Sequence, residues 1–317
     1  MKIYFISTLL SFGCSLLFSF LLIPVLRKLK AGQNILSYVK EHKQKGGTPT
    51  MGGIAFIAAS VIISLCFFKG YGRGEILCIV IGLSYMIVGL IDDFLKLRHK
   101  ENLGLHAWQK LLFQACIALF SGIYCYRAGL TKLNIPFFSK RINLGFWIIP
   151  LVIFVFIATV NAVNLTDGLD GLASGVSVPF FAVLGTLIVL QTGFSNLSVI
   201  SFCLVGGLLA YLLFNSPPAS VFMGDTGSLS LGGFAASIAV FSENTLFIPV
   251  LGICFVTSVV SVILQVVYFK ATGGKRIFLM APVHHHFQQK GFSETKISYA
   301  YFLISLILGT LCIAFNL

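Results

Sequence analysis

The sequence predicts an all-α polytopic membrane protein with about ten transmembrane helices. Of its 317 residues, 57% are hydrophobic and only 10% are charged. Apolar runs of about 20 residues, the length that crosses a bilayer as a helix, recur from one end of the chain to the other. Segments such as 148–160 are apolar on every side, whereas strands of an outer-membrane barrel alternate in polarity. Little is left for a soluble domain, so residues 1–317 are predicted to form a single integral membrane domain.

Each predicted span is an apolar run bounded by polar or helix-breaking residues. The first could be mistaken for a signal peptide, but it is too long, lacks a small-residue cleavage site and is followed by Arg27 and Lys28. Almost no loop separates the fifth span from the sixth, prolines stop the seventh, and the eighth is rich in Gly and Ser. The ten predicted spans are residues 3–26, 51–68, 75–95, 108–127, 145–163, 170–190, 196–214, 226–241, 245–268 and 297–316.

Charge predicts the orientation, because positively charged short loops stay in the cytoplasm. With both termini outside, most lysines and arginines fall on the cytoplasmic side, in segments 27–45, 96–110 and 270–296. Without the eighth span the last of these segments would move outside, so ten spans keep the bias. The same topology places every aspartate and histidine at the cytoplasmic face, which is where we expect the active site. These residues are Asp92, Asp93, Asp167, Asp170, Asp225, His42, His99, His106, His284, His285 and His286.

The third span ends in the sequence DDFLK. Asp92 and Lys96 are four residues apart and share a face if the helix continues. One interpretation is an interfacial ion pair that reaches water. The other follows from Asp92 and Asp93 being adjacent, because paired carboxylates repel unless a cation or a proton lies between them, which suits general-base work or metal ligation.

The sequence NAVNLTDGLDG joins the fifth and sixth spans. Asp167 and Asp170 are three residues apart and would lie on one helical face. Asp167 could simply be the N-cap of the sixth span. That interpretation leaves Asp170 close to hydrocarbon, where an unpartnered charge costs on the order of 3 kcal/mol, so a polar partner for it is predicted.

The sequence NSPPASVFMGDTGS follows the seventh span. Its prolines stop a helix, and its glycines let backbone approach a ligand. Asp225 is the first choice for a direct Mg²⁺ ligand. Magnesium keeps several waters and needs only one or two carboxylates plus substrate phosphate, so the scarcity of carboxylates favours it over calcium or zinc.

Two further motifs lie near predicted cytoplasmic loops. APVHHHF follows a basic stretch, and its histidines suit phosphate hydrogen bonding, with an accidental zinc-binding or tag-like run as the alternative. In GTPTMGG, Thr50 could cap the second span while the preceding Lys45 reaches an anion. No GxxxxGK[ST] motif occurs, which excludes a P-loop ATPase. The eight cysteines lie in apolar spans without CxxC pairing and are predicted to be packing residues.

In this order and spacing, DDFLK, NAVNLTDGLDG, NSPPASVFMGDTGS and APVHHHF resemble the phospho-N-acetylmuramoyl-pentapeptide transferases. These enzymes belong to the polyprenyl-phosphate N-acetylhexosamine-1-phosphate transferase superfamily, and the resemblance covers essentially the whole chain. The HHH triplet together with GTPTMGG is similar to the muramoyl branch rather than to the branches that use UDP-GlcNAc. After HHHF that family commonly has Glu, whereas this chain has Gln288.

The resemblance implies a multi-pass enzyme of the bacterial cytoplasmic membrane that acts in peptidoglycan biosynthesis. It would transfer phospho-MurNAc-pentapeptide from UDP-MurNAc-pentapeptide to undecaprenyl phosphate, giving lipid I and UMP, with Mg²⁺ as cofactor. The expected partners are these two substrates and the lipid bilayer, with a homodimer, nucleoside-type inhibitors at the uridine site and no nucleic acid. Two rival functions are a superfamily relative that transfers GlcNAc-1-phosphate and a cation-coupled transporter that uses the buried aspartates as ion sites.

Roles for the site residues follow from the resemblance and from phosphoryl-transfer chemistry. Asp225 is expected to bind Mg²⁺, Asp92 to deprotonate the lipid phosphate, and Asp93 and Asp167 to support the metal and phosphates. An aspartyl nucleophile with a covalent intermediate is a competing mechanism. Uridine recognition is expected at Asn164, Asp170, Phe222 and Gly224. The full substrate-binding set is Lys45, Thr50, Lys96, Lys110, Asn164, Asp170, Asn215, Phe222, Gly224, His284, His285 and His286.

Overall fold

A computed structural model describes residues 1–29, 47–99, 104–138, 140–193 and 195–316. Most of these residues are in α-helices, so the helical prediction is confirmed. The helices are α1 (Lys2–Lys28), α2 (Gly53–Phe67), α3 (Arg73–His99), α4 (Ala107–Arg127), α5 (Ile148–Thr166), α6 (Leu172–Thr192), α7 (Asn196–Asn215), α8 (Gly224–Phe241), α9 (Ile248–Leu251), α10 (Ile253–Ala271), α11 (Val283–Gln289) and α12 (Glu294–Asn316).

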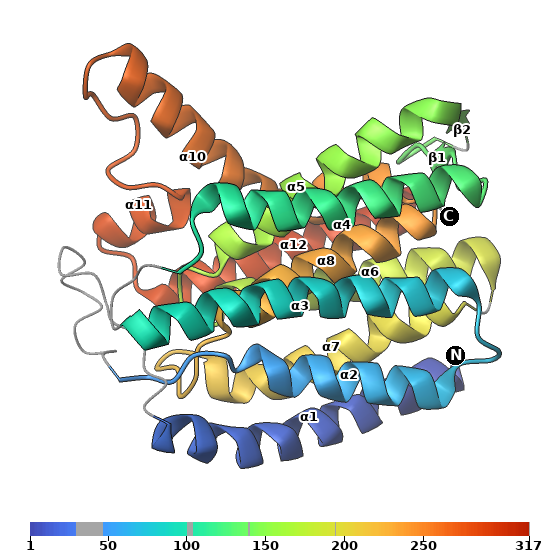
Figure 1. The fold of residues 1–317 in the computed structure, drawn as a ribbon, viewed down its shortest axis with the longest axis horizontal. Helices are drawn as coiled ribbons and strands as arrows, with labels where there is room; N and C mark the ends of the chain where they lie inside the picture. The colour runs from blue at the N-terminus through green and yellow to red at the C-terminus, as the bar shows by residue number, and fades with distance from the viewer. Residues whose placement is uncertain (30–46, 100–103, 139, 194, 317) are drawn as a thin grey trace.

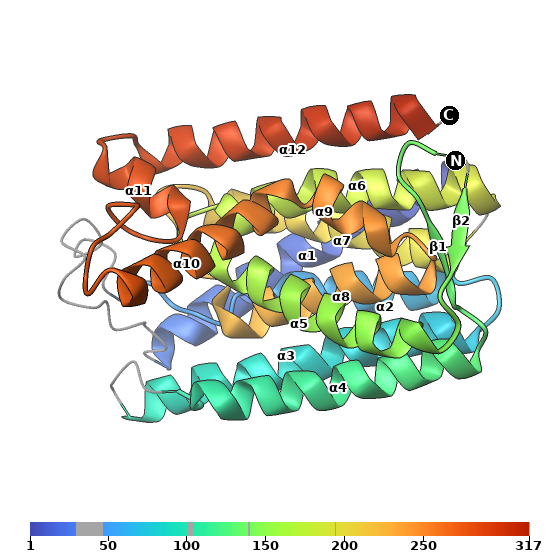
Figure 2. The ribbon, with the colours of Figure 1, turned by 90° about the horizontal axis from the view of Figure 1, so that it is seen from above.

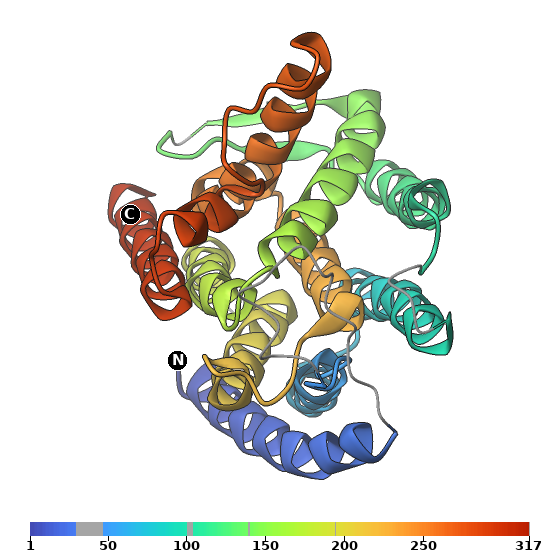
Figure 3. The same cartoon turned by 90° about the vertical axis from the view of Figure 1, so that its left-hand side faces the viewer.

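The long helices run roughly side by side, and both termini lie at one end of the bundle (Figure 1). The opposite end carries the last turn of α3, the first turn of α8 and the short helix α11. Seen from that end, α1 lies on the periphery and α10 projects away from the bundle (Figure 3).

Within the described residues, seven helices are long and apolar enough to cross a membrane. They are α1, α3, α5 with the turn before it, α6, α7, α10 and α12. A chain with several such helices is a multi-pass membrane protein. The remaining predicted spans 51–68, 108–127 and 226–241 coincide with α2, α4 and α8, which are shorter or less apolar.

Helix α8 is buried along almost its whole length, from Thr226 to Phe241. It packs against α3 and α5, its main neighbours. Its small residues make this possible, because a Cβ atom at Gly232 would lie 2.6 Å from the Val160 Cα atom of α5. The Gly and Ser content that makes α8 a poor lipid-facing span therefore suits a central helix, where neighbouring backbones approach closely.

Two predictions about the end that carries the termini are wrong in detail. The predicted span 245–268 is interrupted: a short turn η3 (Thr245–Phe247) and α9 precede a break at Gly252, and α10 then continues to Ala271. The all-α prediction also missed a small antiparallel hairpin, β1 (Lys132–Asn134) with β2 (Arg141–Asn143), followed by the turn η2 (Gly145–Trp147). The hairpin lies at the end that carries the termini (Figure 2), and strands of three residues are too short to show a polarity pattern.

Candidate active site

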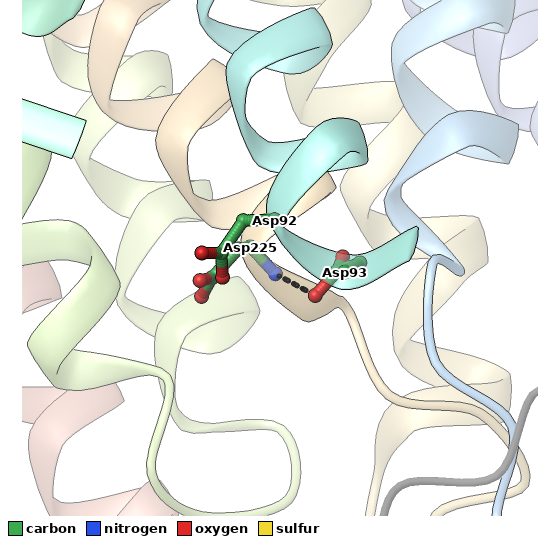
Figure 4. A group of neighbouring side chains, drawn as sticks. All are labelled: Asp92, Asp93 and Asp225. Carbon is green, nitrogen blue, oxygen red and sulfur yellow. Dashed lines mark hydrogen bonds between the residues drawn. The ribbon is translucent and has the colours of Figure 1, made fainter. Parts of the chain in front are cut away.

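Three aspartates meet where α3 ends and α8 begins (Figure 4). Asp92 and Asp93 are on the last turns of α3, and Asp225 is on the first turn of α8. One carboxylate oxygen from each lies within 4.8 Å of the others. Asp225 therefore forms one cluster with two carboxylates that come more than 130 residues earlier in the sequence. Carboxylate oxygens are the ligands expected at a site for a hard cation.

Asp225 is the residue on which the neighbouring helices converge. Its Oδ2 atom accepts from the Nζ atoms of Lys96 at 2.9 Å and Lys110 at 2.6 Å. Its Oδ1 atom accepts from Asn164 Nδ2 at 2.7 Å. These partners come from α3, α4 and α5, so one carboxylate links three helices to the start of α8.

Asp92 shares the same two lysines. Its Oδ2 atom lies 2.6 Å from Lys96 Nζ, as the four-residue spacing predicted, and 3.4 Å from Lys110 Nζ. Its Oδ1 atom accepts from the backbone N–H of Leu105 at 2.8 Å. Only 1% of Asp92 is exposed. The two ammonium groups therefore lie between Asp92 and Asp225 and partly neutralise them.

In contrast to Asp92, Asp93 bonds to the first turn of α8 and caps this helix. Its Oδ2 atom accepts from the Thr226 backbone N–H at 2.9 Å and from the Thr226 hydroxyl at 2.7 Å, and its Oδ1 atom accepts from the Asp225 N–H at 3.2 Å. A carboxylate is a favourable partner for the free N–H groups of a helix N-terminus. Asp93 thereby holds the turn that carries Asp225.

Replacing Asp93 with Asn is expected to lower the free energy of unfolding by about 1–3 kcal/mol, because an amide group would face backbone donors with a donor of its own. The shift of the unfolding midpoint in detergent measures this effect. Thr226→Ser is the control, since it keeps the hydroxyl donor. An unchanged midpoint for Asp93→Asn would contradict the capping role.

The segment before α2 pairs with the segment before α8. Phe222 N–H donates to the Pro49 carbonyl at 2.8 Å, and Gly52 N–H donates to the Phe222 carbonyl at 2.9 Å. The predicted cap at Thr50 is wrong: α2 begins after Gly52 with no side-chain cap. The Thr50 hydroxyl is instead buried and has no hydrogen-bond partner among the described residues. The predicted anion ligand Lys45 lies outside the described residues.

A cavity of about 200 Å³ opens beside the carboxylate cluster. It is lined by all four residues predicted to recognise uridine, although they come from two separate segments of the chain. An amide, a carboxylate and an aromatic ring beside a glycine backbone can recognise the face and the edges of a flat polar base. The lining residues are Asp93, Asn164, Asp167, Gly168, Leu169, Asp170, Asn215, Phe222, Gly224 and Asp225.

Two of the lining residues also hold the shape of the cavity. The Oδ2 atom of Asp170 accepts from the Ala219 N–H at 3.0 Å, which is the polar partner that the sequence required. The amide of Asn215 accepts from the Ser174 hydroxyl at 2.6 Å and donates to the Val221 carbonyl at 3.0 Å. These bonds tie the 216–223 loop to the start of α6.

Asp167 follows the last residue of α5, and Gly171 occupies the N-cap position of α6. The alternative in which Asp167 caps the sixth span is therefore wrong. Burial raises the pKa of Asp167 to about 8, with further contributions from the negative charges of Asp225, Asp93 and Asp170. Its carboxyl group is thus poised to ionise when a cation enters the site.

The raised pKa of Asp167 predicts a pH-dependent stability. Between about pH 4, the ordinary value for Asp, and about pH 8, the unfolded chain loses this proton while the folded protein keeps it, so stability falls as pH rises. Asp167→Asn, which stays neutral, should raise the unfolding midpoint more at pH 8.5 than at pH 5, without substrate or metal. Equal shifts at both pH values would show that Asp167 titrates normally.

The three histidines of α11 have three different surroundings. His284 is fully buried, neither ring nitrogen has a hydrogen-bond partner among the described residues, and burial lowers its pKa to about 3. His285 Nδ1 lies 3.1 Å from Gln288 Oε1. His286 Nδ1 accepts from the Leu279 N–H at 3.1 Å. Among the described residues, the three histidines therefore do not form one candidate metal cluster.

Comparison with known proteins agrees with this arrangement. The sequence profile of glycosyl transferase family 4 matches residues 76–243. The phospho-N-acetylmuramoyl-pentapeptide-transferase of Clostridium botulinum (strain Eklund 17B / Type B) is 45% identical over 305 residues, which cover 95% of this chain and 92% of that protein. The enzyme of Caldanaerobacter subterraneus subsp. tengcongensis is 44% identical over 310 residues, covering 96% of each chain.

This chain belongs to the phospho-N-acetylmuramoyl-pentapeptide-transferase family. The enzyme of Clostridium novyi (strain NT) is similar to the same degree, with 45% identity over 97% of this chain and 95% of its own length. The resemblance inferred from the four motifs is thereby confirmed. In this member of the family, residues of the first three motifs line the cavity, and α11, which carries the three histidines, lies at the same end of the bundle (Figure 1).

The residues of this transferase fit a divalent cation. Asp225 lines the cavity and offers hard carboxylate oxygens, and Asp92 and Asp93 offer more within 4.8 Å. Lys96 and Lys110 hold Asp225 Oδ2. The cluster thus combines three carboxylates with two ammonium groups. These groups can exchange partners when a cation and an anionic ligand enter.

Sequence reasoning missed three polar residues of the site. Thr226 donates to Asp93, and its place directly after Asp225, on the first turn of α8, was the available signal. Gln288 was noted only as a departure from the family pattern, and it lies next to His285. No sequence motif pointed to Glu294, because its contact with the Asp170 backbone joins residues that are 124 positions apart.

Proposed function

We propose that this protein transfers phospho-MurNAc-pentapeptide from UDP-MurNAc-pentapeptide to undecaprenyl phosphate, giving lipid I and UMP in peptidoglycan biosynthesis. The observation that carries the proposal is the position of Asp225, which lines the cavity and is bonded to Lys96 and Lys110. Phosphoryl transfer requires cations and oriented donors around the phosphates more than covalent chemistry by the protein. Relatives with the corresponding name support the choice of sugar.

Lys96, Lys110 and His285 are proposed to bind phosphate. The Nζ atoms of Lys96 and Lys110 both lie between Asp92 and Asp225, and Asp225 lines the cavity. A diphosphate would accept hydrogen bonds from the same ammonium groups and offset their charge. In the cavity, the Phe222 ring is proposed to stack on uracil while Asn164 and Asp170 meet its polar edge.

We propose that the cation is Mg²⁺ and that Asp225 holds it, with Asp93 and Asp167 supporting the site. When bound, the cation supplies charge neutralisation of the diphosphate oxygens and so favours the departure of UMP. Asp93 keeps the turn of Asp225 in place through its bonds to Thr226. Burial and the neighbouring carboxylates raise the pKa of Asp167 to about 8 and so favour its protonated form in the substrate-free site, and a bound cation would favour its ionised form.

Asp92 is the proposed base for the lipid phosphate. It shares Lys96 and Lys110 with Asp225, so a phosphate bound by those lysines would lie close to its carboxylate. A direct attack by the lipid phosphate and a two-step reaction through an aspartyl intermediate both use these groups. Release of UMP in an initial burst without the lipid acceptor would identify the two-step route.

The remaining proposals concern assembly and topology. We propose ten membrane spans in one domain over residues 1–317, with both termini outside and the carboxylate cluster at the cytoplasmic face. The cavity that would hold uridine is also the proposed site for nucleoside-type inhibitors. A homodimer in the bilayer completes the proposal.

The function is tested by UMP release from purified protein in detergent, with undecaprenyl phosphate and Mg²⁺. UDP-MurNAc-pentapeptide and UDP-GlcNAc are compared as donors, and a chelator is the control. Metal-dependent release from the muramoyl donor alone is expected. Release from UDP-GlcNAc alone would move the chain to another branch of the superfamily, and no release from either donor would contradict a transferase.

A further inference from the structure

A chain of hydrogen bonds joins the histidine helix α11 to the first turn of α12. His285 Nδ1 lies 3.1 Å from Gln288 Oε1, and Gln288 Nε2 donates to Glu294 Oε1 at 3.2 Å. The other carboxylate oxygen of Glu294 accepts from the Asp170 N–H at 3.4 Å. One turn later, the Ser298 hydroxyl donates to the Asp170 carbonyl at 3.0 Å. The first turn of α12 therefore holds both α11 and the turn that carries Asp170.

The chemistry of these groups determines which atoms carry hydrogen. The carboxylate of Glu294 only accepts hydrogen bonds, so the buried Gln288 amide must turn its Nε2 atom toward Glu294 and its Oε1 atom toward His285. Because Oε1 is also only an acceptor, His285 Nδ1 must carry a proton and donate. His285 Nε2 is then the nitrogen that accepts a hydrogen bond in the neutral ring or donates one to a phosphate in the cationic ring.

His285 Nε2 lies close to Gly168, a residue of the cavity wall. A Cβ atom built on Gly168 would lie 3.0 Å from this nitrogen, and Gly168 lines the cavity next to Asp167. The absence of a side chain at Gly168 thus lets the imidazole approach the cavity wall. The hydrogen bonds on the Nδ1 side determine how the ring presents its other nitrogen to this wall.

We infer that Gln288 and Glu294 are positioning residues of this transferase. Together they set the Nδ1–H form and the orientation of His285, and Glu294 also positions the backbone of Asp170. The inference rests on the proposed function, because His285 is proposed to bind substrate phosphate and Asp170 is proposed to bind uridine. It adds to that function a structural link between His285, on the phosphate side of the substrate site, and Asp170, on the uridine side.

Exchanging the two side chains tests the network. Gln288→Leu removes both the acceptor for His285 and the donor to Glu294, and Glu294→Gln alone leaves one amide oxygen for two N–H donors. Each is expected to lower kcat/KM for UMP release roughly tenfold to a hundredfold by misplacing the substrate groups. In the double variant Gln288→Glu/Glu294→Gln, the carboxylate accepts from His285 and from the new amide, whose oxygen accepts from Asp170. Its kcat/KM should return to within about twofold of the original value.

Gln289→Glu is the matched control, because it makes the same charge change on the exposed neighbour of Gln288 and should leave kcat/KM unchanged. A double variant that is no more active than Glu294→Gln would overturn the inference, as would single variants with unchanged kcat/KM.

A second readout does not depend on activity. Nitrogen-15 NMR of histidine-labelled protein, with the His285 signals assigned through His285→Gln, should show a proton on Nδ1 that Gln288→Leu removes or weakens. A neutral ring protonated on Nε2 would overturn the inference even if the protein is a transferase. Absence of UMP release by the unaltered protein would instead contradict the proposed function, while the NMR result would still decide the network.

Discussion

Asp225→Asn is expected to lower UMP release on the order of a thousandfold, because the loss of a direct metal ligand removes several kcal/mol of charge stabilisation from the transition state. The carboxylate also anchors Lys96, Lys110 and Asn164, so these three side chains lose their common partner. The rate should be measured across a Mg²⁺ titration. An unchanged rate with unchanged Mg²⁺ dependence would show that Asp225 is not the ligand.

Glu75→Gln is the matched control for Asp225→Asn. It removes a carboxylate from the first turn of α3, at the other end of the helix that carries Asp92. The activity and the Mg²⁺ dependence should both stay within about twofold of the original values, since distant sites act independently. A comparable loss in both variants would indicate a general effect of charge removal rather than a metal site.

Gly224→Ala is expected to lower kcat/KM on the order of a hundredfold, the effect of a displacement of about 1 Å in a catalytic site. Gly224 has φ 71°, a conformation that L-residues adopt only at a cost of roughly 1–2 kcal/mol. A Cβ atom there would collide with the Asp93 carboxylate and lie 2.6 Å from the Thr50 hydroxyl. The substitution would therefore displace the residue that caps α8 and, with it, Asp225.

Gly175→Ala controls for a glycine substitution as such. Gly175 is also a helical residue, in α6, but a Cβ atom there would have no neighbour within 4 Å. Alanine favours helix more than glycine does, so unfolding should be unaffected or slightly harder. Full activity of Gly224→Ala would contradict the tight packing around Asp93, whatever the control shows.

Local and distant contacts differ in how well the sequence predicted them. The ion pair of Asp92 and Lys96 followed from a spacing of four residues on one helix and is present at 2.6 Å. Lys110 and Asp225 are 115 residues apart, and their contact could not be predicted. The sequence predicted only that both residues lie at the same membrane face. The Thr50 cap failed for a related reason, because the backbone before α2 pairs with the distant Phe222 instead of starting a helix at once.

The sequence by itself determined the membrane class, the family and the motifs that supply most of the site. Those properties reside in composition, in apolar runs of fixed length and in short motifs, all of which are local along the chain. Only the tertiary structure decided that α8 is central, that Asp93 caps it, that the cavity joins three segments, and that Glu294 reaches His285 through Gln288. These features depend on which helices pack together and in which register, and a hydrophobic pattern that marks each helix separately does not encode that choice.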